Sequence, residues 1–183
     1  YVPLNPKFPV EKNKQMLDSS GAKILIIQSK FINQINYLAK NIKDLLIFIP
    51  DINKYSKNKK LSKCYLFTKK DFDSKDTNLS TFFTTKSQTN CYLLFTSGST
   101  GKPKGVPINN MNIMSYLNNV YQRYKPNKKD RFSHNFDLTF DLSIHDIFLC
   151  WLSGACLYVS PKSLIINPGH FIKKNKLTFW FSV

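Results

Sequence analysis

The sequence predicts an α/β fold in which a mainly parallel sheet is flanked by helices. Two continuous apolar runs rich in Ile and Leu, AKILIIQ (22–28) and DLLIFIP (44–50), have the composition of strands that are buried on both faces. Polar stretches long enough for helices separate the apolar runs. A third run, CYLLF (91–95), leads directly into a glycine-rich loop, a position where open α/β sheets bind ligands.

The first element expected along the chain is a helix that Pro9 opens and Gly21 ends, with Met16 and Leu17 on its inner side. Between the two Ile-rich strands, residues 31–42 are long enough for a short helix. Strand, helix and strand in this order form a β/α alternation, which implies parallel pairing.

Residues 51–90 are polar and have no clear period apart from KCYLFT (63–68). They are expected to form a surface connection that contains one small strand. The strand at 91–95 and the glycine-rich loop at 96–105 follow.

A helix is expected from Asn109 to Tyr124, because apolar residues recur there at spacings of three and four. Asn109 or Asn110 can cap its start, and Pro126 follows its end. Residues at this spacing share one face of a helix, so a core-facing stripe is predicted from Met111, Met114, Leu117, Tyr121 and Tyr124.

From Arg131 onward, strands and helices are expected to alternate, at 131–136 (strand), 142–154 (helix), 155–160 (strand), 167–175 (helix) and 176–183 (strand). The final strand is expected to be buried, and it stops without a turn or a polar tail. The chain begins at Tyr1 rather than Met. We therefore expect residues 1–183 to be part of one domain that is truncated at both ends.

The formal net charge of +16 first suggests a nucleic acid or an anionic membrane as partner, because a basic surface releases counterions from phosphates. Only two of the 27 basic residues are Arg, however, and the Lys residues are spread along the whole chain. Nucleic-acid sites favour the bidentate guanidinium group. We interpret the charge as a compositional bias and expect neither nucleic acid nor membrane as a partner.

The four cysteines show no C-x-x-C spacing, and three of them lie within apolar runs. This pattern is typical of buried free thiols in a reducing compartment, so a cytoplasmic location is expected. The apolar runs LLIFI and IFLCWL are far shorter than the ~18 residues that a membrane helix needs.

The loop TSGSTGKPKG (96–105) is suited to bind a polyphosphate. Its glycines allow backbone N–H groups to approach and turn toward one anion. Hydroxyl donors and positive charge come from Thr96, Ser97, Ser99, Thr100, Lys102 and Lys104. A Gly/Ser turn without a ligand would not require so many hydroxyl side chains.

Two commoner phosphate loops do not fit the spacing. Counted from Gly98, a Walker A loop needs its second glycine where this chain has Pro103. A dinucleotide fingerprint needs a glycine at the position of Thr100.

The stretch LLFTSGSTGKPKGV (93–106) resembles the phosphate-binding signature of the adenylate-forming (AMP-binding) enzymes. This superfamily contains acyl-CoA synthetases, luciferases and the adenylation domains of nonribosomal peptide synthetases. Residues 1–26 resemble an early segment of those adenylation domains, and FDLS (140–143) resembles their next core motif. The resemblance, weakest at 51–90, extends to D-alanine–carrier protein ligases. It implies part of the large N-terminal domain of such an enzyme, without the C-terminal subdomain.

The resemblance implies an ATP-dependent ligase that converts a carboxylic acid into an acyl-adenylate, releases pyrophosphate and passes the acyl group to a thiol. Fixed N–H, hydroxyl and ammonium donors suit the charge that builds on the phosphates in this reaction. By resemblance, Mg²⁺ would accompany ATP and Lys102 would be solvated. The ATP phosphates would be held by Thr96, Ser97, Gly98, Ser99, Thr100, Gly101 and Lys104.

Asp141 matches the position where amino-acid-activating members hold the substrate's α-ammonium group, and an ammonium removed from water needs a charged partner. The alternative is that Asp141 only caps the following helix. Leu142 and His145 match the side-chain pocket. The nearby acidic and imidazole groups lack a recognised metal spacing, so no metal ligand is expected, and solvated or capping roles are predicted for Asp137, Asp146 and His134.

The favoured interpretation is an enzyme that activates an amino acid and loads it onto the phosphopantetheine thiol of a carrier protein. The nearest alternative is an acyl-CoA synthetase for a fatty or aryl acid, which would have no use for a carboxylate at Asp141. A non-catalytic or degenerate nucleotide-binding fragment is a second alternative. The family's catalytic Lys lies in the C-terminal domain, so no catalytic residue is assigned here and this chain by itself is expected to be inactive.

Overall fold

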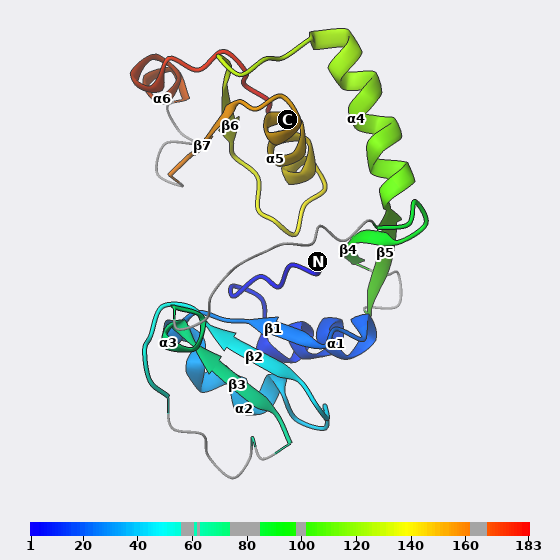
Figure 1. Ribbon diagram of the computed structural model, residues 1–183, viewed down its shortest axis with the longest axis vertical. Coiled ribbons are helices and arrows are strands. Elements are labelled where there is room, and N and C mark those ends of the chain that lie inside the picture. The colour runs from blue at the N-terminus through cyan, green and yellow to red at the C-terminus, as the bar shows by residue number, and fades with distance from the viewer. Residues whose placement is uncertain (56–60, 62, 74–84, 98–101, 162–167) are drawn as a thin grey trace. The chain divides into compact units, whose positions relative to one another are not determined.

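Figure 1 shows the computed structural model, which describes residues 1–55, 61, 63–73, 85–97, 102–161 and 168–183. The chain divides into two compact units. Unit 1 contains Tyr1, Thr85–Leu94 and Pro107–Val183, and unit 2 contains Val2–Thr84 and Phe95–Val106. Parallel strands that alternate with helices confirm the predicted α/β class.

Unit 2 is built on a parallel sheet with the strand order β1-β2-β3. The strands are β1 (Ile24–Ile26), β2 (Leu46–Ile49) and β3 (Tyr65–Thr68). The helical segments are α1 (Val10–Ser20), the 3₁₀ helix η1 (Ser29–Gln34), α2 (Ile35–Leu38) and α3 (Lys69–Asp73). The helix expected within 31–42 is therefore divided between η1 and α2.

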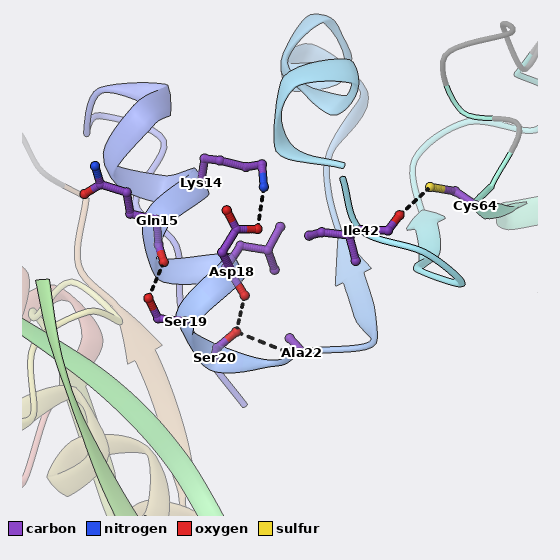
Figure 2. Close-up of polar contacts among 9 residues, drawn as sticks. Lys14, Gln15, Asp18, Ser19, Ser20, Ala22, Ile42 and Cys64 are labelled. Atoms are coloured by element: carbon purple, nitrogen blue, oxygen red, sulfur yellow. Dashed lines mark hydrogen bonds and ion pairs between the residues drawn. The ribbon is translucent and has the colours of Figure 1, made fainter. Parts of the chain in front are cut away.

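Helix α1 begins and ends where the sequence predicted. Gly21 follows it in the left-handed conformation with a φ of 64°, and Met16 and Leu17 are buried. Figure 2 shows the last turn, where the Ser20 hydroxyl donates to the Leu17 carbonyl at 2.7 Å and accepts from the Ala22 N–H at 3.2 Å. Ser20 thus provides a partner for a carbonyl that the helix itself leaves unpaired.

The core of unit 2 covers one face of strand β1. Leu25 is buried in this core, whereas Ile24 and Ile26 are 59% and 67% exposed. The prediction that both Ile-rich strands are buried on both faces is therefore wrong for β1. Successive side chains of a strand point to opposite faces, so burial of one face leaves the alternate residues open.

Unit 1 contains a parallel pair of strands, β6 (Arg131–His134) and β7 (Cys156–Val159). Helix α5 (Leu142–Leu152) forms the crossover that a parallel pair requires, and α6 (Pro168–Asn175) follows β7. The core of this unit includes Phe132 on β6 and Leu149 on α5.

The strand predicted at 176–183 is wrong. Among the described residues, Phe179 makes an isolated parallel bridge to Phe132, and no longer ladder extends from it. Val183 is 95% exposed. Strand β6 has four residues, so it offers few pairing positions to a further strand.

Helix α4 (Asn110–Tyr124) has the predicted bounds. A capping box starts it, in which the Asn109 side chain accepts from the Asn112 N–H at 2.8 Å and the Asn112 side chain accepts from the Asn109 N–H at 3.3 Å. The predicted use of Asn109 as the cap is confirmed.

The predicted core stripe of α4 is confirmed at Leu117 and wrong at its two Met residues. Ile113 and Leu117 are buried, whereas Met111 and Met114 are 55% and 43% exposed. Residues four apart lie on one line along a helix. Because α4 packs along the line through Ile113 and Leu117, the two Met side chains lie outside the buried core.

Strands β4 (Asn90–Ser97) and β5 (Pro103–Asn109) form a two-stranded sheet. The connection at 98–102 is too short for a parallel crossover, so the pair is a hairpin. Strand β5 was not predicted, because its Pro and Gly residues are depleted from most strands.

All four cysteines are free, and burial raises the pKa of the Cys150 thiol to about 11. Cys64 is also buried, and its sulfur faces the Ile42 carbonyl at 4.0 Å (Figure 2). Cys156 is exposed, so the expectation of buried thiols fails at that position. Within the described ranges, no helix has the length and apolar character needed to cross a bilayer.

Candidate functional site

The predicted phosphate-binding residues that the structure describes lie on strands β4 and β5. Thr96 and Ser97 end β4, and Lys104 lies in β5 rather than in the loop where it was expected. The Thr96 hydroxyl donates to the Lys104 carbonyl at 3.4 Å, which holds these two residues side by side. The remaining predicted residues lie outside the described part of the chain: Gly98, Ser99, Thr100 and Gly101.

The hydroxyl and ammonium groups of this hairpin are accessible to an anion. Thr96, Ser97 and Lys104 are all exposed, and so is Lys102, as its predicted solvation requires. Strand pairing fixes the backbone of Lys104, so the ammonium group moves only through its own side-chain torsions. The hairpin therefore exposes hydroxyl donors and ammonium groups to solvent from a backbone held by strand pairing.

The predicted acid-binding residues line a cavity of about 300 Å³ within unit 1. Asp141, Leu142 and His145 come from the start of α5, and the structure brings all three to this one cavity. The other lining residues lie on β4, β5, α4 and α5: Tyr92, Ile108, Asn112, Ile113, Tyr116 and Ile144.

The Asp141 carboxylate is available to a ligand. Asp141 occupies the residue position immediately before α5, but its side chain makes no capping hydrogen bond. The side chain is exposed and forms part of the cavity wall. Its geometry therefore does not support the alternative in which Asp141 serves only as a helix cap.

Tyr116 on α4 and His145 on α5 form a hydrogen-bonded pair in the cavity wall. The Tyr116 hydroxyl lies 2.8 Å from His145 Nδ1. Burial lowers the pKa of His145, although the neighbouring Asp146 opposes this shift, so the imidazole is neutral at neutral pH. Burial, and then the Asp141 carboxylate, raise the pKa of the Tyr116 hydroxyl. The phenol therefore keeps its proton and remains able to donate.

Asp146 on α5 and His134 on β6 form a second close pair of side chains in unit 1. Asp146 and His134 are 1% and 9% exposed, and His134 Nδ1 lies 3.6 Å from Asp146 Oδ2. The same carboxylate oxygen accepts from the Asn135 N–H at 3.4 Å. The prediction of solvated or capping roles is therefore wrong for Asp146 and His134. Asp137 is exposed, as predicted, and its carboxylate accepts from the Thr139 N–H and hydroxyl in a local turn.

The Asp146→Ala substitution is expected to destabilise the β6–α5 region by about 2 kcal/mol, because it removes a buried carboxylate that accepts from the Asn135 N–H and lies 3.6 Å from His134 Nδ1. Hydrogen exchange of the β6 and α5 amides would measure this as faster local opening. The control is Asp73→Ala, which removes an exposed carboxylate from α3. Equal protection of β6 and α5 in both variants would contradict a stabilising role for Asp146.

Tyr116 is the cavity residue that sequence reasoning missed most clearly. It lies three residues after Ile113 and four after Asn112, and both of these also line the cavity. The signal was therefore present in the helical spacing, but the predicted stripe was placed on the Met residues instead. Among the described residues, no group of three His, Cys, Asp or Glu side chains is arranged to hold a metal ion.

The family profile described as AMP-binding enzyme matches residues 1–183, the whole chain. The chain belongs to the AMP-binding enzyme family. This AMP-binding enzyme is 27% identical over 189 residues to an L-proline–(L-prolyl-carrier protein) ligase of Pseudomonas fluorescens, covering 100% of this chain and 35% of that protein. It is 28% identical over 191 residues to a D-alanine–D-alanyl carrier protein ligase of Listeria welshimeri, covering 100% of this chain and 32% of that protein.

A solved structure gives the same picture of the fold. The chain matches the crystal structure of the Vibrio cholerae adenylation domain AlmE in complex with glycyl-adenosine-5'-phosphate, with a TM-score of 0.84 and 29% sequence identity. The match covers 100% of this chain and 35% of AlmE. The chain thus spans about a third of the length of each of these three proteins.

Proposed function

We propose that the protein activates an amino acid with ATP and transfers it to the phosphopantetheine thiol of a carrier protein. The observation that carries this proposal is the Asp141 carboxylate, which is exposed on the cavity wall and makes no capping bond. A carboxylate in this state is suited to pair with an α-ammonium group that leaves water on binding.

In the proposed reaction, a carboxylate oxygen of the amino acid attacks the α-phosphorus of ATP. A new P–O bond forms, the bond to the β-phosphate oxygen breaks, and pyrophosphate leaves with the electron pair. The aminoacyl-adenylate then loses AMP when the carrier thiol attacks its carbonyl carbon. Charge accumulates on the phosphate oxygens during the first step, so donors fixed around them lower its barrier.

The phosphate donors in this proposal are Thr96, Ser97 and Lys104, together with the loop residues Gly98, Ser99, Thr100 and Gly101. Their hydroxyl, N–H and ammonium groups are the donor types that bind polyphosphates. Mg²⁺ typically binds through substrate phosphates and few protein carboxylates, so it would enter with ATP.

Two relatives and one solved structure support an amino acid as the substrate. Their names specify L-proline, D-alanine and a glycyl-adenylate. Each carries a protonated α-amino group, which is a secondary ammonium in proline, and a carboxylate at Asp141 would pair with it. Leu142 and His145 would contact the remainder of the substrate in the same cavity.

The first test is pyrophosphate exchange into ATP, measured with protein produced from its complete coding sequence. The screen would contain the proteinogenic amino acids, D-alanine, β-alanine, and simple fatty and aryl acids. Exchange driven by one or a few amino acids is the expected result. Exchange driven only by acids without an amino group would instead favour an acyl-CoA synthetase, and no exchange with any acid would favour a non-catalytic nucleotide-binding protein.

A further inference from the structure

The cavity at Asp141 has one wall whose shape is fixed by two helices together. Tyr116 projects from α4 and His145 from α5, and the 2.8 Å contact between the Tyr116 hydroxyl and His145 Nδ1 joins them. Both residues line the cavity. The phenol and imidazole rings meet edge to face, with centroids 6.1 Å apart.

This wall lies next to the group proposed to hold the substrate. His145 follows Asp141 by four residues, and Asp141 has helical dihedral angles, so both point to the same side of α5. Asp141 and Tyr116 also line the same cavity. A substrate whose ammonium group contacts Asp141 would therefore place its α-carbon close to the Tyr116–His145 pair.

The imidazole cannot move away easily when a larger substrate enters. The Tyr116 hydroxyl engages one side of the ring, and the Phe181 ring lies 4.5 Å from the imidazole centroid. A wall held by these two contacts excludes large side chains more strongly than a flexible wall would.

We propose that Tyr116 is a specificity-determining residue that, with His145, restricts the enzyme to amino acids with small side chains. This inference rests on the proposed function, because it assumes that the substrate's ammonium group binds at Asp141. In apolar sites each methylene group that fits or clashes changes kcat/KM by roughly 10- to 200-fold. Removing the phenol is expected to shift the preference toward larger substrates by about tenfold or more.

The test is pyrophosphate exchange by the complete protein with a graded series: glycine, alanine, valine, leucine and phenylalanine. The Tyr116→Ala variant is expected to raise the ratio of kcat/KM for leucine over alanine by about tenfold or more. The Tyr116→Phe variant keeps the ring and loses only the bond to His145, so its ratio should move by much less. Tyr124→Ala is the matched control, since Tyr124 is on the same helix, is 55% exposed and does not line the cavity.

Each outcome decides between the inference and the proposed function. An unchanged size ratio in an active Tyr116→Ala variant would overturn the role of Tyr116 and leave the proposed function intact. If the wild type used only acids without an amino group, the amino-acid proposal would fail. Acetate, butyrate and hexanoate would then test Tyr116, through the ratio of kcat/KM for the longer acids over acetate. If no acid drove pyrophosphate exchange by the wild type, calorimetry would measure binding of the same compounds and give the ratio of affinities for large over small substrates. Binding of none of them would overturn both proposals.

The Tyr116→Ala variant can be checked for folding independently of activity. The side chain is 43% exposed, so its truncation leaves most core contacts of α4 in place. Unchanged thermal melting relative to Tyr124→Ala is expected. Should the Ala variant melt at a lower temperature, Tyr116→Leu would replace it, because leucine keeps part of the buried volume while still removing the phenol end.

Discussion

The Asp141→Ala variant is expected to lose roughly 100-fold or more of its kcat/KM in amino-acid-dependent pyrophosphate exchange. Removing one partner of a charge pair that becomes desolvated on binding costs about 3 kcal/mol, and every 1.4 kcal/mol is a factor of ten. An acid without an amino group makes no such pair at Asp141. Its exchange rate is therefore expected to change by no more than a few-fold.

The comparison of amino acid with matched des-amino acid provides the control within one variant. Alanine and propionate differ only in the amino group, so a general loss of folding or ATP binding would lower both rates equally. Asp141→Asn adds a second control, because it keeps the shape and polarity of the side chain and removes only its charge. Equal losses on alanine and propionate would show that Asp141 acts through the helix rather than on the ammonium group.

The Lys104→Ala variant is expected to lower exchange about 100-fold with every acid, since it removes one fixed donor from the phosphates whose charge grows in the transition state. The effect should appear at saturating acid and should not depend on the acid's identity. Steady-state exchange at several ATP concentrations would measure both kcat and the KM for ATP.

Lys102→Ala is the matched control for Lys104. Both lysines lie on the same side of the connecting loop, are exposed and carry the same charge. The contribution of charge alone is modest for an exposed group. A loss at Lys102 as large as that at Lys104 would assign the effect to the net charge of the hairpin and would remove Lys104 from a specific phosphate contact.

Much of the fold was predictable from local sequence signals. Helix α1 lies between Pro9 and Gly21, and α4 starts at the Asn109 cap, because these residues act through their own backbone geometry and nearest hydrogen bonds. Failures occurred where burial depends on distant residues. Ile24 lies in an apolar run with the composition of a buried strand, yet the core covers only the opposite face of β1.

The candidate site was predictable wherever a motif fixed both the residue type and its spacing. Asp141, Leu142 and His145 follow one another along α5, so their convergence on one cavity could be expected from the FDLS stretch. Tyr116 and Tyr92 reach the same cavity from α4 and β4, which are separate in sequence. No short motif connects these elements, so their contribution required the packed structure.

The sequence by itself determined which residues are proposed to bind phosphate and an ammonium group, because a glycine-rich loop and an FDLS motif are local patterns of backbone freedom and charge. It also determined the α/β class through alternating apolar and polar stretches. Only the tertiary structure decided that Asp141 is uncapped and exposed, that Asp146 and His134 are buried, and that Tyr116 meets His145. Burial and contacts of this kind depend on which distant elements pack together, and no local sequence pattern specifies that packing.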